Sequence, residues 1–434
     1  MPSAPNSSRR VNAGAAAVSA VRRVDWRSWL PFAVVVLGAS LVAWPPVQHP
    51  EMPIKIFPDS GSYLSWGYGR PPTGFFFYTL VGSGRPALIA QTLLSIASWS
   101  AFGWLALGLP GAIAAAALVM ALPVSIWNYA VLSESITLSL GAAVCAASIA
   151  LGRRWSAPRF IAWLVAAVLF TGVRAENFFL VPPLLLALLA HHRRHWLALL
   201  AAGALCAALF VTFSVVADKE NRNWQIRMTN LVLTRIRPER ELRAQFEALG
   251  MPSGPELDGW HGHMLAAYDP AFAPATPEFQ HWLDTQSRPT YLRWLATAEP
   301  HRQLAKWLDF SLLRRDDAFN YYAGGLRLPR AATATFPFWD ALRVPFKFWW
   351  VLAALPLAAS LAMRRITFAQ SFALAYLAAV YALTFVVFHA DTGELERHLA
   401  LVGALYRMAP LVMLGSVWSA GRAAMHRRSC APAS

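Results

Sequence analysis

The acidic residues outside the segment 218–345 are few, and their positions give the first sign of chemistry. There are eight of them: Asp25, Glu51, Asp59, Glu134, Glu176, Asp391, Glu394 and Glu396. All except Asp25 lie at the end of a hydrophobic stretch. An ionisable group next to hydrocarbon is costly unless it is paired or faces water, so such groups are functional candidates by default. We therefore examined these seven acids and the cations near them first.

Asp59 lies in the segment 57–63 (FPDSGSY), where proline and glycine predict a turn or a helix N-cap. Capping alone could explain it, because aspartate is common at N-caps, and it would then cap a short interfacial helix over 63–68. The aromatic segment 70–78 (RPPTGFFFY) follows and suits the headgroup region of a membrane. This setting favours a functional role for Asp59.

Glu134, in the segment 132–135 (LSES), lies where two apolar stretches meet. It either caps the second of them or takes part in function, and the expected presence of Asp59 on the same face favours function. Arg174 and Glu176 interrupt another apolar stretch. They could form a local ion pair beside unwound backbone, which is tolerated only where it is buried in protein or lines a cavity. That structural role and a functional role are compatible.

The segment 389–398 (HADTGELERH) has the densest charge near the predicted membrane. A solvated loop is the simple alternative, but Arg407 argues against it. Arg407 lies nine residues beyond His398, which is about 13 Å along a helix into the membrane. An arginine at that depth needs an anionic partner. A lipid phosphate suits it, since guanidinium matches phosphate geometry.

Composition indicates the elements that must position these residues. The chain has 434 residues, of which 56% are hydrophobic and only 14% charged, whereas globular proteins have about 25% charged residues. Several apolar runs reach the roughly 20 residues that a membrane-spanning helix needs. We therefore predict an all-α polytopic membrane protein in contact with a lipid bilayer.

The net charge of +15 raises the question of a nucleic-acid partner, but the distribution of arginine predicts none. Arginines stand in short runs beside apolar segments, the pattern of positively charged cytoplasmic ends. The runs are Arg9/Arg10, Arg22/Arg23/Arg27, Arg153/Arg154, Arg193/Arg194, Arg364/Arg365 and Arg427/Arg428.

Ten transmembrane segments are predicted, with both termini in the cytoplasm. They are 29–47, 87–109, 110–127, 136–151, two within 160–190 that meet at an outer break near 172–177, 196–217, 346–362, 368–388 and 399–421. The resulting organisation is a basic tail (1–28), a first membrane part (29–217) with an outer loop (48–86), an extracytoplasmic insert (218–345), a second membrane part (346–421) and a cytoplasmic tail (422–434). The arginine-rich start before a long apolar run predicts a retained first helix rather than a cleaved signal peptide.

The insert is predicted to be ordered and mostly helical. It is rich in aromatic residues, unlike disordered chain, and segment 279–313 has helical spacing that Pro300 should divide into two short helices. Of the three cysteines, Cys145, Cys206 and Cys430, none lies in the insert, so no disulfide framework is expected there. The spacing of His261 and His263 is weak evidence for a metal site, and solvated histidines are the commoner explanation.

On these features the chain resembles the GT-C superfamily of membrane glycosyltransferases, nearest to bacterial members that transfer lipid-linked mannose or aminoarabinose. The likeness covers the membrane part. It rests on the acid in the first outer loop (PDSGSY, 58–63), the following arginine and prolines (RPPTG, 70–74), a second acid in the next outer loop (SES, 133–135), the insert, and the late Glu-Arg-His cluster (396–398). No Asp-x-Asp occurs in the first or second outer loop, so the metal-dependent oligosaccharyltransferase branch is not supported.

The resemblance implies transfer of a sugar from a polyprenyl-phosphate donor to an acceptor hydroxyl at the periplasmic face of a bacterial inner membrane. It implies that Asp59 is the general base and that Glu134, the other catalytic residue, positions the acceptor or holds the arginines. The reaction is expected to be inverting and without a metal; a divalent cation remains an alternative. The residues expected to bind the donor phosphate are Arg174, Arg397, His398 and Arg407. Those expected to position substrate are Tyr63, Arg70, Glu176, Glu394 and Glu396.

A transporter or flippase for a lipid-linked or anionic substrate is the alternative function, because broken helices and buried charges also occur in transporters. Transporters of this kind place their charges near the midplane of the membrane and often show inverted repeats. Acids at one interface, a long outer insert and no visible repeat favour the enzyme. The sugar and the acceptor stay open.

Overall fold

A computed structural model of the protein describes residues 26–42, 54–57, 59–66, 70–263, 266–297, 349–390 and 395–429. In these ranges the chain is all-α, as predicted, with a single β-bridge between Lys55 and Ala130. The segments that precede and follow this bridge carry the candidate site.

Five helices of the described chain are long and apolar enough to cross a membrane. They are α6 (Arg85–Leu107), α9 (Ser133–Arg153), α12 (Trp196–Asn221), α23 (Phe368–Ala390) and the apolar part of α24 (Leu395–Ser429). Five shorter apolar helices occupy the other predicted segments: α2 (Trp26–Val42), α7 (Leu109–Met120), α10 (Ala157–Thr171), α11 (Val181–His191) and α22 (Trp349–Ala362). The chain is therefore a candidate multi-pass membrane protein.

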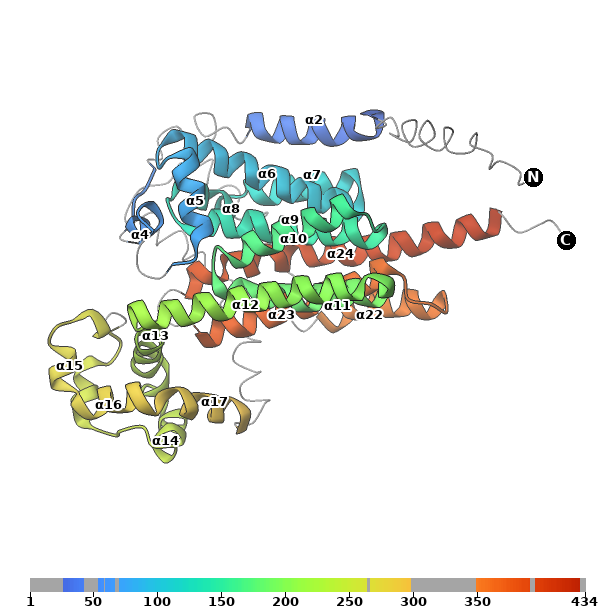
Figure 1. The fold of residues 1–434 in the computed structure, drawn as a ribbon. Helices are drawn as coiled ribbons and strands as arrows, with labels where there is room; N and C mark the ends of the chain where they lie inside the picture. The colour runs from blue at the N-terminus through green and yellow to red at the C-terminus, as the bar shows by residue number, and fades with distance from the viewer. Residues whose placement is uncertain are drawn as a thin grey trace, which may run out of the picture.

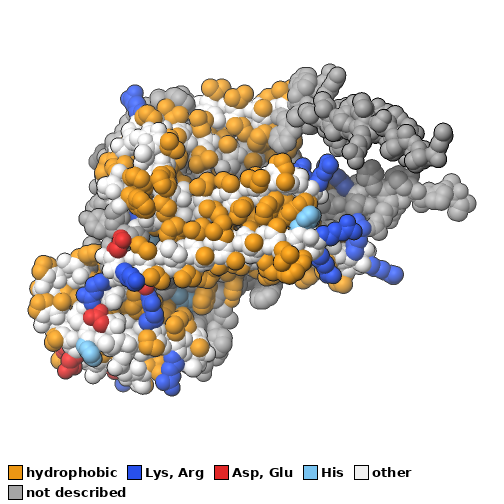
Figure 2. Space-filling model, in the orientation of Figure 1, with side chains coloured by type: hydrophobic (Ala, Val, Ile, Leu, Met, Phe, Trp, Pro, Cys, Tyr) orange, Lys and Arg blue, Asp and Glu red, His pale blue; other side chains and the backbone are white. Residues whose placement is uncertain are grey.

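These helices lie side by side in one bundle (Figure 1). The closest packing joins α6 to α7 through two glycines, since a Cβ atom on Gly103 would lie 2.1 Å from the carbonyl oxygen of Gly111. Small residues allow such close approach between helices in apolar surroundings. Figure 2 shows hydrophobic side chains over the flank of the bundle, with Lys and Arg side chains gathered at one end and mixed charge on the insert at the other.

The bundle has two distinct ends (Figure 1). The short helices α4 (Ser60–Leu64) and α5 (Pro72–Val81) lie at one of them, together with the start of the insert at α13 (Asn223–Leu231). We call this the site end. The opposite end, where α9 finishes at Arg153 and α24 passes Arg422, is called the arginine end.

The predicted break between the fifth and sixth segments is confirmed. Helix α10 ends at Thr171, and a 3-10 turn over Ala175–Leu180 precedes α11. Helix α5 docks at this break, where the Thr73 N–H donates a hydrogen bond to the Gly172 carbonyl at 3.0 Å. A Cβ atom on Gly172 would lie 2.4 Å from Thr73 Oγ1, so the approach needs glycine.

Several helix ends differ from the predicted ones. The third segment is not one helix to residue 127, because α7 ends at Met120 and is followed by α8 (Leu122–Ser125) and a 3-10 turn (Ile126–Tyr129). The fourth begins at residue 133 rather than 136, which places Glu134 in its first turn. Helix α24 continues to residue 429, beyond the predicted end at 421. Ser133 and Glu134 are polar but buried in the first turn of α9, a contribution of packing that hydrophobic length does not report.

The described part of the insert is helical and has its own apolar core, as predicted. Its helices are α13, a π-helix (Val232–Ile236), α14 (Arg240–Ala248), α15 (Phe272–Ala275), α16 (Pro277–Thr285) and α17 (Ser287–Thr297), with 3-10 turns at Pro255–Trp260 and Ala266–Tyr268. The predicted interruption at Pro300 lies outside the described residues. A break that the spacing did not show divides α16 from α17 at Gln286.

The insert caps the end of α23. Arg235 donates to the carbonyl of Phe388 at 2.5 Å, and the Tyr291 hydroxyl donates to the carbonyl of His389 at 2.9 Å. The last carbonyls of a helix have no partner within it, and a cation beside them is favourable. Burial raises the pKa of Tyr291 above its ordinary value, so the hydroxyl keeps the proton that it donates.

Candidate functional site

Asp59 lies at the N-cap position of α4, but its side chain does not cap the helix. Instead, its carboxylate pairs with Arg70, with 3.4 Å between Oδ2 and Nη2. About a third of each side chain is exposed: 32% for Asp59 and 36% for Arg70. The Arg70 guanidinium also lies over the Tyr63 ring, 5.5 Å from its centre. The capping explanation therefore does not account for this carboxylate, which remains reachable from solvent.

Helix α4 is fixed to the chain that leads into α9. Ser60 Oγ donates to the Val131 carbonyl at 2.6 Å and accepts a hydrogen bond from the Phe57 N–H at 2.8 Å. The bridge of Lys55 with Ala130 lies next to this contact, with the Lys55 N–H donating to the Tyr129 carbonyl at 2.7 Å. Asp59 thus has a rigid attachment to the segment that carries Glu134.

A buried ion pair lies beside this attachment. Glu134 accepts a hydrogen bond from Nη2 of Arg174, and only 2% and 9% of the two side chains are exposed. Arg174 Nε donates to Ser133 Oγ at 2.7 Å, and the Tyr63 hydroxyl donates to the same oxygen at 2.9 Å. Ser133 therefore links α4 to the break between α10 and α11.

A second layer of hydrogen bonds holds the segment before α9. The Tyr78 hydroxyl, on α5, donates to the Leu132 carbonyl at 2.6 Å. Gln91 Nε2, on α6, donates to the Asn128 carbonyl at 3.3 Å, and Ser135 donates to the side-chain oxygen of Asn128 at 2.5 Å. These contacts fix the direction of Glu134, because its backbone has support from two neighbouring helices.

Glu176 connects the break to the start of α24. Its Oε1 lies 3.9 Å from Nδ1 of His398, and the exposed fractions of the two side chains are 14% and 11%. The charges of Arg227, on α13, and of Arg174 also act on this carboxylate. The insert therefore contributes a cation to the site.

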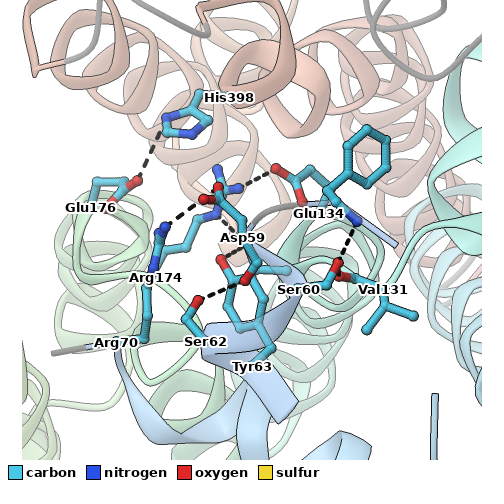
Figure 3. A network of polar contacts seen from close by, with 12 residues as sticks. Asp59, Ser60, Ser62, Tyr63, Arg70, Val131, Glu134, Arg174, Glu176 and His398 are labelled. Carbon is cyan, nitrogen blue, oxygen red and sulfur yellow. Dashed lines mark hydrogen bonds and ion pairs between the residues drawn. The ribbon is translucent and has the colours of Figure 1, made fainter. Parts of the chain in front are cut away.

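Figure 3 shows the residues that the structure brings together, and they come from segments far apart in sequence. They are Asp59, Tyr63, Arg70, Glu134, Arg174, Glu176 and His398. Arg407 lies deeper on α24 with 1% of its surface exposed, and it donates to the Gly403 carbonyl of its own helix at 3.1 Å. Glu394 and the side chains of Glu396 and Arg397 lie outside the described residues.

Sequence reasoning missed two members of this group. Ser133 was not among the predicted site residues, although its hydroxyl accepts hydrogen bonds from Tyr63 and Arg174. Arg227 was not among them either. Nothing in the local pattern marks Arg227, because its approach to Glu176 depends on where α13 packs.

Metal ligands do not gather in the part of the chain that the structure describes, where no three His, Cys, Asp or Glu side chains could share an ion. His261 and His263 are both exposed, and His263 lies against the Trp260 ring with 5.7 Å between the ring centres.

The charged side chains of the site differ in how much of each is exposed to solvent, and this limits which of them can react with a ligand. Asp59 and Arg70 are open to a ligand, Glu176 and His398 are mostly covered, and Glu134 and Arg174 are enclosed. An accessible carboxylate can accept a proton, and nearby cations can bind a phosphate. The enclosed pair can only orient its neighbours. Comparisons with protein-family models, curated proteins and solved structures find no match to this chain.

Proposed function

We propose that the protein is a membrane glycosyltransferase that moves a sugar from a polyprenyl-phosphate donor to an acceptor hydroxyl. The observation that carries the proposal is the accessible Asp59–Arg70 pair fixed beside the buried Glu134–Arg174 pair. An accessible base and several cations at the end of an apolar bundle suit a donor with a lipid tail and a phosphate head. The resemblance to GT-C enzymes supplies the reaction class.

In the proposed reaction Asp59 accepts the proton of the acceptor hydroxyl. The acceptor oxygen forms a bond to the anomeric carbon while the bond from that carbon to the phosphate oxygen breaks. The lipid phosphate leaves with the electron pair, and attack from the opposite face inverts the anomeric configuration. Cations aimed at the developing phosphate charge lower the barrier.

The structure suggests how the cations divide this work. Arg174 forms an ion pair with Glu134, so we assign both as positioning residues. They hold Ser133 and, through it, Tyr63. Arg70 is the more exposed cation and His398 lies beside Glu176 at the start of α24, and we assign both to the phosphate together with Arg397. Arg407 is enclosed, with 1% of its surface exposed, so we do not assign it to the phosphate.

The direct test measures sugar transfer in membranes supplied with labelled polyprenyl-phosphate sugars, including mannose and aminoarabinose donors. We expect Asp59→Asn to lower the rate by about 100-fold or more, the usual contribution of a general base. Asp218→Asn is the matched control, because Asp218 pairs with Arg288 on the insert. Unchanged transfer by Asp59→Asn would refute the assignment of the base, and no transfer by the wild type with any donor would refute the donor class.

The proposed orientation places the site end on the periplasmic face of a bacterial inner membrane. Gly61 is exposed on α4, and Arg194 is exposed at the arginine end. Cysteine introduced at each position, with Cys430 replaced by serine, should react with a membrane-impermeant maleimide from opposite sides. Labelling of Gly61→Cys from the cytoplasm would reverse the proposed topology.

A transporter is the second candidate, and the break between α10 and α11 with its buried charges favours it. Reconstituted vesicles distinguish the two functions. A transporter moves the lipid-linked substrate across the bilayer without changing it, whereas the enzyme produces free polyprenyl phosphate.

A further inference from the structure

The arginine end contains a cavity that the proposed reaction does not use. It lies among α6, α9, α23 and α24, is partly open to the surface, and has a volume of about 170 Å³. Most of its walls are apolar, and they include Leu105, Ile149, Phe368, Phe372 and Val412. A cavity of about 150 Å³ with such walls accepts a molecule of the size of benzene. This one therefore has room for several methylene groups of a chain.

A cluster of cations lies beside the cavity. Arg153 lines it and donates a hydrogen bond to the Leu105 carbonyl. Arg159 donates hydrogen bonds to the carbonyls of Ala150 and Arg154, next to Arg153 in the chain. The charges of Arg422 and Arg159 both act on Arg153. In the part of the chain that the structure describes, no carboxylate forms an ion pair with any of the three. Like charges held close together attract a counter-anion.

The surroundings place this cluster at the level of lipid headgroups. The Arg422 guanidinium lies 5.2 Å from the centre of the Trp418 ring, and Trp418 is 55% exposed. Tryptophan and arginine at the end of an apolar helix are typical of the membrane–water interface. Basic pockets between membrane helices on the positively charged side bind anionic lipid headgroups.

We infer that this cavity binds one anionic phospholipid of the adjoining leaflet. Its phosphate lies against Arg153, Arg159 and Arg422, and part of one acyl chain fills the apolar cavity. A free phosphate ion would satisfy the cations but would leave the apolar walls uncovered, so the lipid explains both features. The inference does not depend on the proposed transferase activity, because the site lies at the other end of the bundle.

The experiment uses the full chain, purified in a neutral detergent, with native mass spectrometry and thermal unfolding as readouts. Phosphatidylglycerol should remain bound and raise the unfolding temperature, whereas phosphatidylcholine and inorganic phosphate should not. Stabilisation by inorganic phosphate equal to that by phosphatidylglycerol would overturn the lipid assignment. So would equal stabilisation by phosphatidylcholine.

Two variants locate the site. Arg153→Gln removes a cation, and we expect about tenfold weaker binding of phosphatidylglycerol, the effect of losing one charge-assisted hydrogen bond. Ala369→Leu adds bulk to the cavity wall and should weaken binding without a change of charge. Arg194→Gln is the matched control, an exposed arginine at the same end that does not line the cavity. Equal affinity in Arg153→Gln, Ala369→Leu and Arg194→Gln would refute the site.

Discussion

The two ends of the bundle use charge in opposite ways. At the site end, Asp59, Glu134 and Glu176 each have a basic side chain close by, and the central pair is enclosed. At the arginine end, the charges of Arg159 and Arg422 act on Arg153, and none of the three forms an ion pair with an acid among the described residues. Charges that are neutralised internally contribute to folding, whereas charges of one sign are available to an outside anion. The enclosed Glu134–Arg174 pair therefore serves the structure, whereas the like charges of the arginine end can attract an anion from outside.

The largest effect should come from breaking the enclosed pair. Glu134→Ala removes the carboxylate that accepts a hydrogen bond from the buried guanidinium of Arg174, and removing one partner of a buried ion pair costs about 3–5 kcal/mol. The measurement is the free energy of unfolding in detergent. Asp218→Asn is the control, since its exposed pair with Arg288 contributes under about 1 kcal/mol. Equal losses of unfolding free energy in the two variants would show that the buried pair stabilises the protein no more than the exposed pair does.

A smaller loss is expected from Tyr63→Phe. The substitution removes the hydrogen bond from the Tyr63 hydroxyl to Ser133 and keeps the ring under Arg70. One buried hydrogen bond contributes about 1 kcal/mol. In the same unfolding assay, Tyr63→Phe should therefore lose less stability than Glu134→Ala. A loss larger than that of Glu134→Ala would mean that Ser133, not the ion pair, organises the site.

The insert should respond to acid through one ion pair, between the buried side chain of Arg237 and the exposed carboxylate of Asp258. The hydrogen bond from Arg237 lowers the pKa of Asp258 below its ordinary value. Because the pKa is lower in the folded state, the pair stabilises the insert above the unfolded pKa of about 3.9, and this stability is lost as the pH falls below it. Asp258→Asn should flatten the dependence of insert unfolding on pH, followed by tryptophan fluorescence between about pH 5 and 3.

The effect of Asp258→Asn should be modest, because 58% of the Asp258 side chain is exposed to solvent. Glu278→Gln, an exposed position on α16, is the control. An unchanged acid response in Asp258→Asn would show that another group governs the acid sensitivity of the insert.

The smallest effect is expected at the arginine end. In neutral detergent without added lipid, Arg153→Gln should change the free energy of unfolding by no more than about 0.5 kcal/mol, as surface substitutions usually do. The lost hydrogen bond to Leu105 is offset by relief of the repulsion from Arg159 and Arg422. A loss comparable to that of Glu134→Ala would show that this cluster is structural after all.

The sequence allowed the apolar helices to be located, because hydrophobic length is a local property. The break at Arg174 and Glu176 was also visible, since two charges interrupt an apolar run. Glu134 and Arg174 were each chosen as candidates for that reason. Their contact, however, depends on the rotation of α9 against the end of α10, and no spacing within either segment reports this rotation.

Other parts of the site could not be predicted, for the same physical reason. The approach of Arg227 to Glu176 follows from the packing of α13, and the docking of Ser60 on Val131 follows from a bridge between two loops. The hydrophobic pattern also predicted some helix ends wrongly, because polar residues such as Ser133 belong to the helix. Long-range contacts decide all of these positions.

The way the insert holds α23 has a mechanical consequence. Arg235 and Tyr291, on two different helices of the insert, donate hydrogen bonds to the consecutive carbonyls of Phe388 and His389. A single hydrogen bond would allow the insert to rotate about it, whereas two hydrogen bonds to neighbouring carbonyls restrict that rotation. The orientation of the described insert relative to α23 is therefore restricted at these two neighbouring points.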